Sequence, residues 1–212
     1  MCHGGDVEMP IDKEPLNIII TGVGGQGNIL ASELVATAAV EAGYVVTVGE
    51  TYGASQRGGT VMSHVRISQR EQFGPLTPTG EADIVVGFEP LETLRMLVFF
   101  GNPSTQVILN SRPNYPISVL SGDAKYPEWG ELVAAIQDMA AHVQIVEATE
   151  LAKAAGNSLS ANVVMVGCLA GSGLLPLSLD SYRQVLARSF TGSHLEVNLK
   201  AFDAGVAAVA ST

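Results

Sequence analysis

The sequence predicts one α/β domain of three layers, with a Rossmann-like, mixed but mostly parallel sheet between helices and a helical C-terminal third. Asn17–Thr21 is a short β-branched run that stops at glycines, as a buried central strand does. A glycine-rich turn, Gly22–Gly27, follows it, and apolar residues then recur at helical spacing over 30–42. Tyr44–Val48 is the next strand. This order of strand, glycine turn, helix and strand is that of a parallel βαβ unit.

The next strand makes the sheet mixed. Thr60–Ser68 alternates apolar and polar side chains, which is typical of a strand with two different faces. The segment before it, Gly49–Gly59, is polar, rich in glycine and too short for a crossover helix. Because parallel neighbours need such a crossover, Tyr44–Val48 and Thr60–Ser68 cannot be parallel neighbours.

The remaining elements follow from the same patterns. Strands are expected at 83–88, 106–110 and 143–147, and helices from Pro90 and over 129–139, 161–171, 179–190 and 193–210. No internal repeat or linker interrupts this order, so residues 16–212 are predicted to form a single domain. Residues 1–15 have no apolar period, and we expect them to form a flexible tail.

Composition excludes some ligands and indicates a protein partner. The chain has 11 Lys and Arg against 21 Asp and Glu, a net charge of −10, so it offers no basic stripe for nucleic acid or for an anionic membrane surface. Only 15% of its residues are charged, which is typical of a chain that buries part of its surface against another subunit. A high Ala and Gly content is the alternative explanation.

The two cysteines and the N-terminal residues indicate a cytoplasmic protein without a cluster of its own. Cys2 and Cys168 cannot supply four thiolates to an iron–sulfur cluster, and no metal-ligand spacing occurs. Cys168 lies in an apolar run, so we expect a buried, inert thiol. The first residues lack a basic stretch followed by an apolar core, and no apolar run approaches the roughly 18–20 residues of a membrane span.

The glycine turn has the form of a dinucleotide-binding motif. Gly22, Gly24 and Gly27 follow the G-x-G-x-x-G spacing between a strand and a helix, where backbone N–H groups and the helix N-terminus favour an anion. Glu50, just past the second predicted strand, occupies the place of a ribose-binding acid. The alternative is that these glycines serve helix–sheet packing or a contact with another protein.

A second glycine-rich loop is expected beside the first. Gly53–Gly59 leaves the carboxyl end of the second strand, and two such loops on one edge form the crevice where open α/β sheets bind ligands. Arg57 in this loop suits the recognition of a carboxylate or phosphate, unless it is an ordinary solvated arginine. The candidate ligand or interface residues are therefore Gly22, Gly24, Gly25, Gln26, Gly27, Ser55, Gln56, Arg57, Gly58 and Gly59.

The sequence contains no recognisable catalytic motif. The four histidines are scattered, and His64 on an alternating strand is interpreted as a structural or interface residue. No nucleophile elbow, phosphate-binding Lys motif or spaced acidic pair occurs. We therefore expect no catalytic residue and no activity from this chain alone.

Four ordered segments, over about 17–205, resemble the gamma domain of pyruvate/2-oxoacid:ferredoxin oxidoreductases. They are 18–27 (IIITGVGGQG), 49–66 (GETYGASQRGGTVMSHVR), 80–95 (GEADIVVGFEPLETLR) and 197–205 (VNLKAFDAG). The run Ser-Gln-Arg-Gly-Gly followed by Val-Met-Ser-His-Val-Arg is most similar to the indolepyruvate-type beta subunit. The pyruvate and 2-oxoglutarate types usually carry another residue pair before Arg-Gly-Gly.

The resemblance implies a division of labour between subunits. The holoenzyme of this family decarboxylates a 2-oxoacid on thiamine diphosphate with Mg²⁺, passes electrons through 4Fe–4S clusters to ferredoxin and forms an acyl-CoA. It implies that those cofactors belong to a large catalytic subunit, that coenzyme A is a co-substrate and that this chain binds no cofactor itself. A stand-alone NAD(P)- or FAD-binding Rossmann protein and a non-catalytic binding module remain as alternatives.

Overall fold

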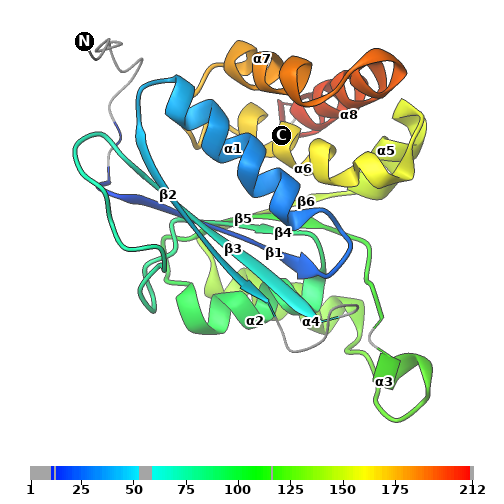
Figure 1. Ribbon diagram of the computed structural model, residues 1–212. Coiled ribbons are helices and arrows are strands. Elements are labelled where there is room, and N and C mark those ends of the chain that lie inside the picture. Colours follow the sequence, from blue (N-terminus) through cyan, green and yellow to red (C-terminus); the bar gives the residue numbers. More distant parts are fainter. Residues whose placement is uncertain (1–10, 12, 53–58, 116, 211–212) are drawn as a thin grey trace.

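The centre of the molecule is a six-stranded sheet in the order β2-β3-β1-β4-β5-β6 (Figure 1). The computed structural model describes residues 11, 13–52, 59–115 and 117–210. The strands are β1 (Leu16–Val23), β2 (Val45–Tyr52), β3 (Thr60–Ser68), β4 (Ile84–Gly87), β5 (Gln106–Asn110) and β6 (His142–Val146). The pairs β1–β4, β4–β5 and β5–β6 are parallel, whereas β3 runs antiparallel to both neighbours. The predicted mixed, mostly parallel sheet is confirmed.

Helices cover both faces of this sheet, as predicted (Figure 1). One face carries α1 (Asn28–Glu41), α5 (Ala148–Ala155), α6 (Ala161–Gly171), α7 (Leu179–Ser189) and α8 (Gly192–Ala210). The other face carries α2 (Pro90–Phe100) and α4 (Trp129–Met139). The short helix α3 (Ile117–Leu120) projects from the body at the lower right of Figure 1, and a 3₁₀ turn over Ser158–Ser160 precedes α6. Sequence analysis missed α3 and α5.

The central strand β1 shows why the molecule has two cores. Every residue of β1 is buried, because strands and helices surround it on all sides. Ile18 and Ile20 belong to the core under α1 and α6–α8, whereas Ile19 points to the opposite core under α2 and α4. This alternation is the period-2 geometry of a strand.

The antiparallel strand β3 separates the two strands of the predicted βαβ unit. β1 and β2 are parallel to each other but each pairs with β3, so one strand lies between them. β2 continues to Tyr52, four residues beyond the predicted end at Val48. The carboxyl ends of β1 and β2 still reach the same edge, because Val23 lies opposite Thr60 and Tyr52 lies opposite Val61.

Part of the second face is covered by a loop instead of a helix. The backbone N–H of Thr77 donates to Nδ1 of His64 at 3.2 Å, and Arg66 Nη1 donates to the carbonyls of Gly74 and Leu76. A Cβ on Gly49 would lie 2.4 Å from the Pro75 carbonyl oxygen, so the loop packs directly on β2. His64 is 1% exposed, which confirms its structural role.

Residues before the predicted boundary at residue 16 already contact the domain. Lys13 Nζ lies 2.8 Å from Asp83 Oδ1, and the Glu14 carboxylate accepts hydrogen bonds from Ser68 and from the backbone of Gln69. The expected tail is therefore too long at its C-terminal end, and residues 1–10 and 12 lie outside the described part. No helix in the described ranges is long and apolar enough to cross a membrane.

Candidate functional site

The glycine turn after β1 is closed by the side chain of Gln26. Its Oε1 accepts a hydrogen bond from the Val23 backbone N–H at 2.7 Å, and its Nε2 donates to the Phe88 carbonyl at 3.2 Å. The Gly24 N–H donates to the Gly59 carbonyl at 2.9 Å. This bond places Gly59, the last residue of the second glycine-rich loop, against the first glycine-rich loop, as predicted. Of that loop's other candidate residues, Ser55, Gln56, Arg57 and Gly58 lie outside the described residues.

The glycines of this turn serve different purposes. Gly27 has a φ of +82°, and a Cβ there would lie 2.4 Å from Asn162 Nδ2. Helix α6 therefore leaves no room for a side chain at this position. A Cβ on Gly22 would lie 2.6 Å from Gln26 Oε1. At Gly25, by contrast, a Cβ would meet nothing within 4 Å, although its φ of +98° disfavours other residues. Gly22 and Gly27 are thus explained by packing, and Gly25 faces open space.

A cleft of about 270 Å³ opens beside Gly25 at the carboxyl edge of the sheet. It lies between the glycine turn after β1 and the end of β4. The helix that follows β1, α1, covers one face of the sheet, and the helix that follows β4, α2, covers the other. This change of face is the place where open α/β sheets bind ligands. Its lining residues include Gly25, Gln26, Phe88, Asn110, Arg112 and Asn162.

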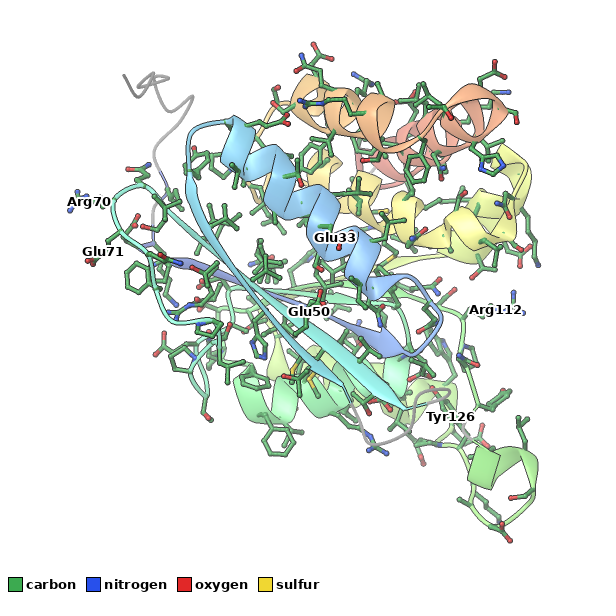
Figure 2. All side chains as sticks on the ribbon, in the orientation of Figure 1. Glu33, Glu50, Arg70, Glu71, Arg112 and Tyr126 are labelled. Atoms are coloured by element: carbon green, nitrogen blue, oxygen red, sulfur yellow. The ribbon has the colours of Figure 1, made fainter. Side chains whose placement is uncertain are left out.

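The cleft is lined by both polar and apolar side chains, and Arg112 is the one charged residue among the described ones. Arg112 is an exposed cation at its mouth (Figure 2). Asn110 is 4% exposed; its Nδ2 donates to the Phe88 carbonyl at 3.1 Å, whereas its Oδ1 has no partner among the described residues. Because a buried polar atom without a partner is costly, this oxygen is a candidate for a bond to a ligand.

The start of α1 adds backbone donors next to this cleft. Its N-cap, Gly27, has no side chain to cap the helix, and no acidic residue occupies its first turn. Asn28 is 2% exposed, and within the described chain neither its Nδ2 nor its Oδ1 has a partner. Free N–H groups at a helix start favour an anion. With Arg112, they make the cleft suited to an anionic ligand.

Several site residues escaped sequence reasoning because they come from distant positions. Asn110 ends β5 and Arg112 follows it, Asn162 lies in the first turn of α6, and Glu89 precedes α2. Their common signal is that a polar residue follows a strand or opens a helix at the carboxyl edge. Glu89 and Glu92 are both buried there, and burial raises the pKa of the Glu89 carboxyl. No group of three His, Cys, Asp or Glu side chains able to hold a metal ion occurs in the described ranges.

The dinucleotide interpretation of the glycine turn does not fit this geometry. Glu50, expected just past the second strand, lies inside β2 opposite Ser63. Because β3 lies between β1 and β2, β2 is two strand spacings, roughly 10 Å, from the glycine turn. In addition, the Gly24 N–H, which would face a pyrophosphate, bonds to Gly59.

Comparison with known proteins identifies the family. Residues 17–208 match the pyruvate ferredoxin/flavodoxin oxidoreductase family. The chain belongs to this family. The indolepyruvate oxidoreductase subunit IorB of Archaeoglobus fulgidus is 41% identical over 190 residues, which cover 90% of this chain and 93% of that subunit.

Solved structures of oxoacid oxidoreductases share the fold. The 2-oxoglutarate:ferredoxin oxidoreductase from Magnetococcus marinus, with 2-oxoglutarate, coenzyme A and succinyl-CoA bound, superposes with a TM-score of 0.72 at 23% identity, over 95% of this chain. This chain corresponds to only 32% of that longer chain. The gamma subunit of a keto/oxoacid ferredoxin oxidoreductase from Geobacter sulfurreducens PCA gives a TM-score of 0.66 at 21% identity, over 93% of this chain and 99% of that subunit.

Proposed function

We propose that this chain is the accessory subunit of a ferredoxin oxidoreductase for indolepyruvate or a related aryl-pyruvate. The observation that carries the proposal is the 41% identity to an indolepyruvate oxidoreductase subunit across almost the full length of both chains. The enzyme would convert the 2-oxoacid and CoA into acyl-CoA and CO₂ and pass two electrons to ferredoxin. This chain acts in that reaction as a subunit and supplies no catalytic residue of its own.

The cofactors of this reaction are assigned to a large catalytic subunit. Thiamine diphosphate with Mg²⁺ and the 4Fe–4S clusters supply decarboxylation and electron transfer there. The described residues of this chain do not suit these groups, because they offer no cluster of metal ligands and their one cysteine, Cys168, is buried. In this proposal the chain shapes a binding surface, and electron transfer belongs to the large subunit.

Exposed apolar side chains support an interface with the large subunit. Val98 and Phe99 on α2 are 61% and 59% exposed, and Leu159, which lines the cleft, is 79% exposed. Large apolar side chains on a surface with few charges are typical of a protein contact. In the Magnetococcus enzyme the matching region is part of a longer chain.

The cleft is proposed to receive the phosphate groups of CoA. Arg112 supplies a donor there, the start of α1 lies nearby, and no acidic side chain is among the described lining residues. Arg57 belongs to the loop that returns at Gly59, beside this edge. A guanidinium there would bind a CoA phosphate, the 2-oxoacid carboxylate or an acidic residue of the large subunit.

Reconstitution with the large subunit tests this assignment. Arg57→Ala and Arg112→Ala should each raise the KM for CoA, or weaken assembly, by at least about tenfold, and Arg57→Lys should recover only part of the loss. The matched control is Arg70→Ala, which removes an exposed arginine far from Arg112 (Figure 2). Assembly is read by size-exclusion chromatography. Wild-type KM and assembly in both variants would show that these arginines are ordinary surface residues.

The two alternative functions have a separate test. A stand-alone nucleotide-dependent dehydrogenase should be stabilised against heat by NAD, NADP or FAD, and a non-catalytic binding module should leave oxidoreductase activity unchanged when it is omitted. We expect no thermal shift with these nucleotides, and we expect the large subunit to lose 2-oxoacid oxidation without this chain.

A further inference from the structure

An arm projects from the molecule beside the cleft. It comprises residues 111–128, of which 116 lies outside the described part, and connects β5 to α4 (Figure 1). Arg112, Pro113 and Asn114 at its base line the cleft. Leu120 further along is 71% exposed. The base of the arm is therefore one wall of the cleft, and the position of that wall depends on what holds the arm.

One buried carboxylate holds both limbs of the arm. Glu89, 1% exposed, follows β4 and caps α2, because its Oε2 accepts the Glu92 N–H at 2.9 Å. Its Oε1 accepts hydrogen bonds from the Tyr126 hydroxyl and, at 3.4 Å, from the Asn114 N–H. Asn114 belongs to the outgoing limb and Tyr126 to the returning limb. Figure 2 shows Tyr126 between the body and the arm.

The residue before Glu89 holds two further segments that line the cleft. The Phe88 carbonyl accepts hydrogen bonds from Gln26 Nε2 in the glycine turn and from Asn110 Nδ2 at the end of β5. Two consecutive residues after β4 therefore connect the glycine turn, β5, the arm and α2. Three of the segments that line the cleft, namely the glycine turn, the end of β5 and the base of the arm, are therefore held at this point.

We propose that Glu89 and Tyr126 form a latch that holds the arm against the carboxyl edge and so positions Arg112 and Asn114 for the anionic ligand of the cleft. Neither latch residue lines the cleft, so both are positioning residues. The identity of the ligand as CoA rests on the proposed function, but the latch itself does not.

The electrostatics of Glu89 make the tyrosine hydroxyl important. Burial raises the pKa of the Glu89 carboxyl, and the hydrogen bonds from Tyr126 and from the Glu92 and Asn114 amides oppose this rise. A buried carboxylate that loses a donor must find water or another partner. Removing the Tyr126 hydroxyl should therefore release the returning limb of the arm, while the cap of α2 by Glu89 Oε2 stays.

Limited proteolysis of the full chain reads the latch directly. Lys125 is the one Lys or Arg between Arg112 and Lys153, and Arg112 precedes a proline that blocks trypsin. Cleavage between Lys125 and Tyr126 gives fragments 1–125 and 126–212, which mass spectrometry identifies. Tyr126→Phe should accelerate this cleavage by about tenfold or more. Such a ratio requires a substantial change in the equilibrium between the held and the released arm. Cleavage after Lys153 in α5 is the internal reference.

A matched variant separates the latch from a general effect on the arm. Tyr115→Phe removes a hydroxyl from the same arm. The Tyr115 ring meets the Tyr126 ring edge to face, with their centroids 5.0 Å apart, and its hydroxyl is not one of the donors to Glu89 described above. The Tyr115→Phe variant should leave cleavage after Lys125 unchanged. Glu89→Gln, which keeps an acceptor, should accelerate cleavage less than Glu89→Ala. Equal rates for wild type and Tyr126→Phe would overturn the latch.

Kinetics of the reconstituted complex read the positioning role. Tyr126→Phe should raise the KM for CoA about fivefold or more while kcat stays within about twofold, because the ligand is held less well but the reacting groups are elsewhere. If cleavage accelerates but only Arg112→Ala changes the KM, the positioning role is wrong and the proposed cleft stands. If Arg112→Ala also leaves the KM unchanged, both are overturned.

Discussion

The two faces of the sheet are built from different chemistry. The face under α1 and α5–α8 is a large, mainly apolar core in which helices approach closely. The face under α2, α4 and the 69–80 loop has a smaller apolar core and buries four ionisable side chains, His64, Arg66, Glu89 and Glu92. The first face should therefore respond to changes in volume, and the second to changes in charge and pH.

Glycines decide how closely α6 and α8 approach. A Cβ on Gly205 would lie 2.0 Å from the Val164 carbonyl oxygen, and a Cβ on Gly167 would lie 2.2 Å from the Phe202 carbonyl oxygen. The helix glycines permit backbone contact between α6 and α8, whereas Gly25 in the β1 turn faces a cleft. Glycine spacing alone therefore does not identify a ligand site.

The largest expected effect is at the contact between these two helices. Gly205→Ala should lower the free energy of unfolding by about 3 kcal/mol, since backbone atoms of both helices must separate to admit the methyl group. Chemical denaturation measures it. The control is Gly130→Ala in α4, where a Cβ meets nothing within 4 Å and the variant should be more stable by roughly 0.5–1 kcal/mol. Equal effects of the two substitutions would contradict the comparison.

A smaller, pH-dependent effect is expected on the second face. Burial, with a contribution from the Arg66 guanidinium, lowers the pKa of His64 from 6.5 to about 4. The unfolded chain therefore takes up a proton first as the pH falls from 6.5 toward 4, and folding stability is lost in that window. Between about pH 7.5 and pH 5 this loss amounts to roughly 2 kcal/mol.

The variant His64→Asn isolates this contribution. Asn keeps an acceptor for the Thr77 N–H but does not titrate. It should be less stable than wild type near neutral pH, because the edge contact of the His64 ring with Phe100 is lost, but it should lose less stability on acidification. Urea unfolding at the two pH values gives the difference. Parallel losses in both proteins would show that His64 does not titrate as inferred.

The smallest effect is expected from a thiol reagent on the first face. Cys168 in α6 is fully buried, as predicted, and burial raises the pKa of its thiol to about 12. In a Cys2→Ser background, a chromogenic disulfide reagent at about pH 8 should not react until denaturant is added, because the thiolate is the nucleophile. Rapid reaction of the native protein would show that α6 opens readily.

Local patterns in the sequence determined most of the fold. The β-branched run that became β1, the apolar spacing of α1 and α8, and the absence of a crossover between β2 and β3 all act within one element or between chain neighbours, so they can be read in order. The adjacency of the two glycine loops was predictable for the same reason, and the bond from Gly24 to Gly59 confirms it. The roles of Ser55–Gly58 stay predictions.

The tertiary structure alone decided which residues meet at the carboxyl edge. Placing β3 between β1 and β2 moved Glu50 away from the glycine turn, and strand order depends on the packing of whole faces and not on any local pattern. The same packing brings Asn162 to Gly27 across 135 residues and Tyr126 to Glu89 across 37. Such pairs carry no sequence signal, because the free energy that selects them comes from burying surfaces contributed by the whole chain.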